Sequence, residues 1–174
     1  MLEALEAELE LRVHPAVYAG AHPSRVGALF ARFILPPVQT RFGWEIPDEL
    51  AADVGARLRA FSLPPSALID GAQELVALWR LDRALDYQDA LALQERLASA
   101  LGASTEPVRY IGPRLCSVHD VELVDAHDPR LPIPLAGPVR GWDGRAPLTE
   151  IIVCDPTRTY PLEEIERAIT GGTE

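Results

Sequence analysis

The fold is decided by one stretch, which reads Pro65-Ser66-Ala67-Leu68-Ile69-Asp70-Gly71-Ala72-Gln73-Glu74-Leu75-Val76-Ala77-Leu78-Trp79-Arg80-Leu81. Residues 66–70 and 74–81 are short apolar runs, and the Gly71-Ala72-Gln73 segment between them is typical of a turn. This pattern predicts a β-hairpin. Helices are predicted on both sides of it, over residues 47–61 and 87–101.

Both predicted helices carry start signals and an apolar stripe. Pro47 suits a first helical position, and apolar residues then recur at helical spacing: Leu50, Val54, Leu58 and Phe61. In the second helix Asp86 is a good N-cap and Gly102 a good stop signal. Its predicted buried stripe consists of Ala90, Leu93 or Gln94, Leu97 and Leu101.

The remaining elements are shorter. A solvated helix is predicted over residues 2–11 and a last helix over 160–169. Strands are predicted over residues 13–21, 29–35, 108–111, 115–118 and 121–124, with a buried strand over 151–154. Helices separated by hairpins favour an α+β fold with a mostly antiparallel sheet, one face of which is covered by helices 47–61 and 87–101. We expect a single domain over residues 1–169 and a flexible tail over 170–174.

Charge limits the partners that this chain can bind. Sixteen basic and 26 acidic residues give a net charge of −10. Such a chain repels phosphate backbones, whose neutralisation supplies most non-specific nucleic-acid affinity. DNA is therefore expected to bind only weakly or through a protein partner. No apolar run is long enough for a membrane span and the first residues do not resemble a signal peptide, so we expect a cytoplasmic protein.

The residues able to do chemistry are few. Cys116, His119 and His127 form the only candidate metal or nucleophile cluster, and their spacing of three and eight matches no common zinc signature. We expect instead a buried cysteine with surface histidines and aspartates around a turn, and no cofactor. A disulfide between Cys116 and Cys154 is one alternative, but with no CxxC pair and no export signal we expect Cys154 also to be a reduced core residue.

The segment 128–147 holds five prolines and three glycines and is predicted to be one long loop. Arg140, Trp142 and Arg145 within it could grip a protein partner or single-stranded nucleic acid. The alternative is that Trp142 pins the loop to the body of the domain.

The hairpin resembles that of plasmid and phage replicative primase-polymerases of the archaeo-eukaryotic primase superfamily. In that family a Pro-Ser-x-hydrophobic-hydrophobic-Asp strand leads through Ser-Gly-x-Gly-x-His to an Ala-Tyr-Trp strand. Further matches are the helix end 96–102, the first strand and its arginine over 17–25, the segment 114–119, and the closing strand and helix over 151–165. The resemblance implies a core similar to an RNA-recognition motif, and it makes Arg25, Arg114 and His119 candidate nucleic-acid contacts.

The catalytic positions of the family are replaced in this chain. Its metal-binding Asp-x-Asp should fall near residues 33–37, yet no acid occurs between Arg25 and Glu45. Its histidine falls at Val76, and its glycine-rich turn at Ala72-Gln73-Glu74. Without carboxylates nothing holds the divalent ions that neutralise nucleotide phosphates. The resemblance therefore implies a domain without nucleotidyl transfer.

Three functions follow as hypotheses. The first is a catalytically inactive primase-polymerase-like domain serving as an accessory or docking module in a DNA replication, mobile-element or defence complex. The second is a small enzyme or metal-binding protein that uses the Cys116, His119 and His127 region. The third is a structural interaction protein with no link to nucleic acid.

Overall fold

The computed structural model describes residues 12–13, 16–19, 22–41, 43–71, 74–111, 121–131, 133–134, 137–138 and 148–171. The predicted helix over residues 2–11 and the predicted strand over 115–118 lie outside these ranges. Among the described residues, no helix is long and apolar enough to cross a membrane.

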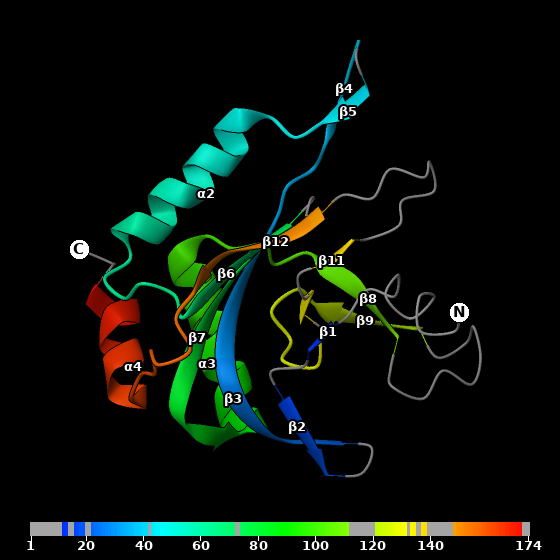
Figure 1. The fold of residues 1–174 in the computed structure, drawn as a ribbon. Coiled ribbons are helices and arrows are strands. Elements are labelled where there is room, and N and C mark those ends of the chain that lie inside the picture. Colours follow the sequence, from blue (N-terminus) through cyan, green and yellow to red (C-terminus); the bar gives the residue numbers. More distant parts are fainter. Residues whose placement is uncertain are drawn as a thin grey trace, which may run out of the picture.

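The centre of the fold is a sheet of six strands in the order β11-β12-β6-β7-β3-β2, in which all neighbours are antiparallel. Figure 1 shows β12, β6, β7 and β3 side by side, with α3 behind them. The strands span β2 Ala16–Ala19, β3 His22–Ile34, β6 Ala67–Asp70, β7 Glu74–Asp86, β11 Gly137–Pro138 and β12 Leu148–Cys154. The α+β fold with an antiparallel sheet is thus confirmed.

The predicted hairpin is formed by β6 and β7. Ala67 lies opposite Leu78 and Asp70 opposite Leu75, and the Gly71 N–H donates to the Glu74 carbonyl at 2.8 Å, which closes the turn. β7 continues to Asp86, beyond the predicted end at Leu81, because it also pairs with β3 along most of its length. β3 likewise begins at His22, well before the predicted start.

Within the described residues, three helices follow from the same local signals: α2 Asp48–Ala60, α3 Tyr87–Leu101 and α4 Leu162–Gly171. α3 has the predicted bounds and ends at Gly102, whose φ of 59° is left-handed and suits glycine. Asp86 occupies its N-cap, but the carboxylate makes no capping hydrogen bond and lies 3.8 Å from the Arg25 guanidinium.

One face of the sheet and the three helices enclose the main core. Its sheet residues include Leu29, Ala31 and Phe33 of β3 and Ala77 and Trp79 of β7. Trp79 is fully buried, and its indole N–H donates to the Leu63 carbonyl at 3.0 Å. The buried helical residues are Val54 and Leu58 of α2, Ala90, Leu93, Gln94, Leu97, Ala98 and Leu101 of α3, and Ile165, Ala168 and Ile169 of α4.

α2 is attached more lightly than α3. Only Val54 and Leu58 of its 13 residues are buried, against six of the 15 residues of α3. A polar contact supplements them, since Arg57 donates to the Gly102 carbonyl at 2.7 Å. α2 therefore packs on the core through few buried side chains and this hydrogen bond.

Side chains close the part of the β3 edge beside which the described residues place no strand. The amide of the buried Gln94 accepts from the Phe30 N–H at 3.0 Å and donates to the Phe30 carbonyl. Ser104 continues this pattern: its hydroxyl accepts from the Ile34 N–H, and its own N–H donates to the Arg32 carbonyl, both at 2.9 Å. α3 and its following segment thus take the place of a further strand.

Small strands lie outside the six-stranded sheet. β4 Val38–Thr40 and β5 Gly43–Glu45 form a hairpin that the sequence analysis missed, whereas β8 Pro107–Ile111 and β9 Val121–Asp125 match predicted strands. β1 Arg12–Val13 pairs with β10 Ile133–Pro134, so the predicted strand over 13–21 is divided. β10 and β11 also interrupt the segment predicted as one loop over 128–147.

The prediction of a buried strand over residues 151–154 is wrong. β12 forms, but Ile151, Ile152 and Val153 are 43%, 54% and 37% exposed. Cys154 is a free, exposed thiol rather than a core residue. The continuous apolar run suggested cover on both faces, whereas β12 lies near the outer side of the sheet, beyond the cover that α3 and α4 give to β3 and β7.

Candidate functional site

The candidate site lies on the sheet face opposite the main core, where β3 and β7 run side by side. Phe30 is opposite Leu78, Arg32 opposite Val76, and Ile34 opposite Glu74. Residues directly opposite in an antiparallel pair project to the same face. This face therefore carries Val76, the position at which the resemblance places a catalytic histidine.

The middle of this face is apolar and filled. Phe30, Ile69, Val76 and Ile133 form a buried cluster against which Leu78 packs. Ile133 belongs to β10 and is fully buried, so the segment after β9 closes over the hairpin. A substrate phosphate would meet hydrocarbon at this point.

A buried ion pair lies beside the apolar cluster. The Arg32 guanidinium is 3.0 Å from the Glu74 carboxylate, and both side chains are largely buried. The Arg32 guanidinium carbon also lies 5.8 Å from the centre of the Phe30 ring, within range of a cation–π contact. Glu74, which takes the place of part of the glycine-rich turn, is thus engaged by an arginine of the neighbouring strand.

The positions expected for the metal-binding acids hold other residues. Phe33 and Leu35 are buried in the main core, and Ile34 is partly exposed on the candidate-site face. Divalent ions in nucleotidyl transfer need carboxylate oxygens. The side chains of Phe33, Ile34 and Leu35 have no oxygen atom that could bind such an ion. In the part of the chain that the structure describes, no three histidine, cysteine or acidic residues form a metal site.

The segment after β9 differs from its prediction. His127 and Asp128 were expected at the surface, but both are buried. The His127 Nε2 lies 3.9 Å from a Glu95 carboxylate oxygen and 4.0 Å from one of Asp125, and neither ring nitrogen makes a hydrogen bond. Cys116 and His119, the other members of the predicted cluster, lie outside the described residues.

Asp128 is held by a network of its own. Arg130 donates to it from its side chain, at 2.7 Å for the closest contact, and the Tyr87 hydroxyl donates to it at 3.1 Å. Burial, and then the negative charge of Asp128, raise the pKa of Tyr87 to about 12. A carboxylate engaged in this way ties the segment after β9 to the start of α3, which is a structural role.

The predicted nucleic-acid contacts are only partly described. Arg25 lies on β3, where its guanidinium donates to the Ala84 carbonyl and approaches Asp86. Its side chain stays half exposed. Arg114 and His119 lie outside the described residues, as do the candidate partner contacts Arg140, Trp142 and Arg145.

No family model matches the sequence, and no curated protein matches it. Among solved structures, the chain is similar to the AEP domain of the primase-polymerase (PrimPol) of cyanophage S-2L. The TM-score is 0.62 at 15% sequence identity, and the match covers 97% of this chain and 74% of that chain. The chain has a primase-polymerase-like fold. At this identity the similarity establishes the primase-polymerase-like fold alone, and the chemistry has to be argued from the residues of this chain.

Proposed function

We propose that this chain is a catalytically inactive primase-polymerase-like domain, which serves as an accessory or docking module in a DNA replication, mobile-element or defence complex. One observation carries the proposal. On the sheet face where the resembled family places its histidine, this chain has the buried Val76 opposite Arg32, and Arg32 is paired with Glu74. A valine cannot act on a triphosphate.

Two further observations support the loss of catalysis. No acid occurs between Arg25 and Glu45, the range in which the metal-binding pair should fall. The apolar cluster around Phe30 and Ile133 fills the space beside Val76. Nucleotidyl transfer depends on positioning and on charge neutralisation by metal ions, and neither the ligands nor the room for it are supplied by these residues.

We expect no primer synthesis and no DNA extension by the purified chain with magnesium, manganese or zinc. The assay measures template-dependent incorporation of labelled nucleotide, with an active primase-polymerase as positive control. Incorporation that disappears in the Glu74→Gln variant would show that this chain is an enzyme and would overturn the proposal. Because the net charge is −10, free DNA is expected to bind no more tightly than roughly 10⁻⁴–10⁻⁶ M.

The docking role points first to the segment 128–147. Five prolines lower the entropy cost of ordering this segment, and tryptophan and arginine, here Arg140, Trp142 and Arg145, are enriched at binding hot spots. We expect Trp142→Ala to leave the melting temperature nearly unchanged while weakening partner capture by about 2 kcal/mol. A loss of about 3–5 kcal/mol in the free energy of unfolding would mark Trp142 as a core residue instead.

A further inference from the structure

Among the residues that the structure describes, the outer edge of β12 is largely unpaired. β6 pairs with its inner edge from Glu150 to Cys154. On the outer edge, β11 pairs only with Leu148 and Thr149, and within the described ranges no other strand joins it. The N–H and C=O groups along such an edge can form hydrogen bonds with a strand from another chain.

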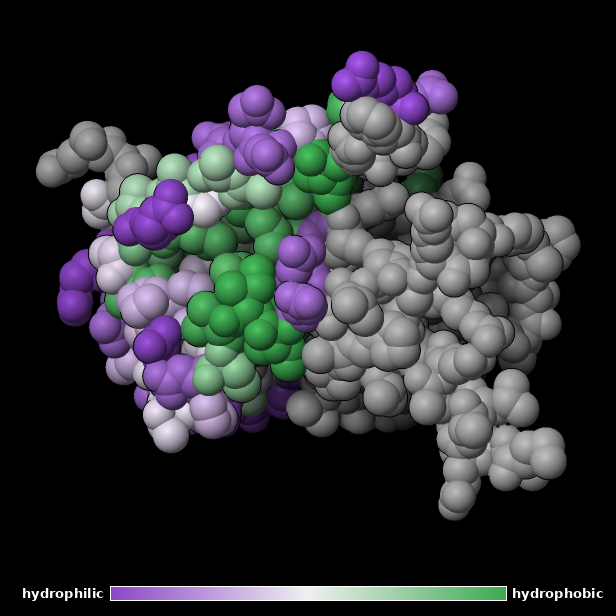
Figure 2. Space-filling model, turned by 45° about the horizontal axis from the view of Figure 1, so that its top comes forward, coloured by the Kyte–Doolittle hydropathy of each residue, from purple (hydrophilic) through white to green (hydrophobic). Residues whose placement is uncertain are grey.

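The exposed side chains of this edge are apolar. Ile151, Ile152 and Val153 are consecutive, and an irregularity in the register falls between the first and the last of them. Ile151 is opposite Ile69 and Val153 is opposite Leu68, which lie on different faces of the sheet. An added strand would therefore find apolar neighbours on both faces. In Figure 2 hydrophobic residues gather at the centre of the face on which β12 lies.

A groove extends this surface towards α2. It has a volume of about 490 Å³ and begins at Val153. Its apolar lining is completed by Leu58, Phe61, Pro64, Pro65 and Leu68. Val153 is thus shared by the edge strand and the groove.

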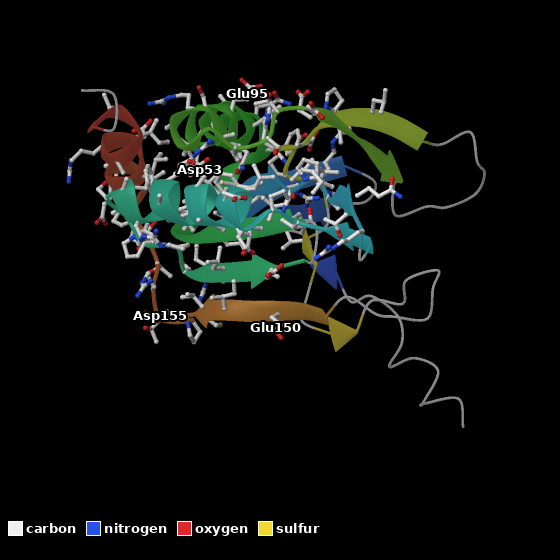
Figure 3. All side chains as sticks on the ribbon, turned by 90° about the horizontal axis from the view of Figure 1, so that it is seen from above. Asp53, Glu95, Glu150 and Asp155 are labelled. Atoms are coloured by element: carbon white, nitrogen blue, oxygen red, sulfur yellow. The ribbon has the colours of Figure 1, made fainter. Side chains whose placement is uncertain are left out.

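Charge indicates which segment would fit this edge. Glu150 is an exposed carboxylate near one end of this edge. At the other end Asp155 is already satisfied, because the Thr157 hydroxyl donates to it at 2.7 Å and Arg158 lies 3.1 Å away. Figure 3 labels Glu150 and Asp155 towards the two ends of β12. A lysine or arginine of an added strand opposite Glu150 would form a pair of opposite charges with it.

A second copy of this chain fits less well. If two β12 strands paired antiparallel about Ile152, Glu150 of each copy would lie opposite Cys154 of the other and would find no lysine or arginine directly opposite it. The two chains would also each bring a net charge of −10. Like charges of this kind disfavour self-association.

We propose that the outer edge of β12 binds an extended segment of another protein, with apolar residues on both of its faces and a lysine or arginine opposite Glu150. The proposal rests on the docking role but not on the loss of catalysis. It therefore stands or falls separately from the nucleotide-incorporation assay. It also assigns a surface that adjoins the segment 128–147 at β11 but consists of other residues.

The test is a titration of the full chain with fluorescein-labelled synthetic peptides. One peptide places valines on both faces of the strand between two terminal lysines, and a matched peptide carries glutamates in place of the lysines. We expect micromolar binding of the lysine peptide and at least tenfold weaker binding of the glutamate peptide. Hydrogen exchange should slow over residues 150–154 when the lysine peptide is added.

Two variants locate the contact. Glu150→Arg should reverse the preference between the two peptides, whereas Glu106→Arg, an equal charge change away from β12, should leave it unchanged. Ile152→Thr should weaken binding at least tenfold with an unchanged melting temperature. Absence of binding, binding without protection of residues 150–154, or the same preference in Glu150→Arg would each overturn the proposal. So would a dimer in analytical ultracentrifugation that Ile152→Thr abolishes.

Discussion

Arg32→Met is expected to lower the free energy of unfolding by about 3–5 kcal/mol, because it leaves the largely buried carboxylate of Glu74 without its cation. Methionine fills a similar volume, so the loss comes from the charge and not from a cavity. The measurement is urea denaturation of the variant and the wild type under the same conditions.

The double variant Arg32→Met, Glu74→Met tests whether the stability lost in Arg32→Met comes from the unpaired carboxylate of Glu74. Replacing both partners of a buried ion pair with apolar residues is often neutral or stabilising, so the double variant should recover most of the lost stability. Arg83→Met is the matched control, since its ion pair with Glu163 is exposed and should contribute less than about 1 kcal/mol. A single variant as stable as this control would show that the carboxylate of Glu74 is well solvated.

Gln94→Leu should lower the free energy of unfolding by about 2–4 kcal/mol, since the N–H and the carbonyl of Phe30 both lose a partner. Leucine has a similar size and a high helix propensity, so packing and helix formation change little. Gln88→Leu on the exposed side of α3 is the control and should stay within about 0.5 kcal/mol. Equal stabilities of the two variants would mean that water replaces the amide of Gln94.

Local signals predicted the centre of the fold. The hairpin over residues 66–81 and the helix over 87–101 each depend on neighbours within a few positions: a glycine turn, an N-cap position and a helical stripe. The helix over 47–61 followed from the same kind of signal. The resemblance to primase-polymerases also rests on these elements, since the matching residues lie in the hairpin and at the end of the helix over 87–101.

Long-range contacts account for most of what the sequence did not show. Arg32 and Glu74 meet only because β3 and β7 pair, and Gln94 reaches Phe30 only because α3 lies along the β3 edge. The burial of His127 likewise depends on elements distant in sequence. No periodicity within a single segment contains such information.

The apolar run over 151–154 is a case in which a local pattern predicted the strand correctly and its burial wrongly. Its composition predicts a strand, and a strand forms. Whether other elements cover that strand depends on its place in the sheet order, which is a property of the whole chain. The same ambiguity makes exposed apolar edges hard to recognise from sequence, although they are where a partner would bind.

The light attachment of α2 has a consequence for motion. Stability is not uniform within a domain, and units with few buried contacts open at a lower free energy than the core. α2 rests on Val54 and Leu58, with one hydrogen bond from Arg57 to the end of α3. We therefore expect α2 to open at a lower free energy than the sheet, α3 and α4. Because Leu58 also lines the groove beside β12, such an opening would widen the groove, and the surface could adapt to side chains of different size.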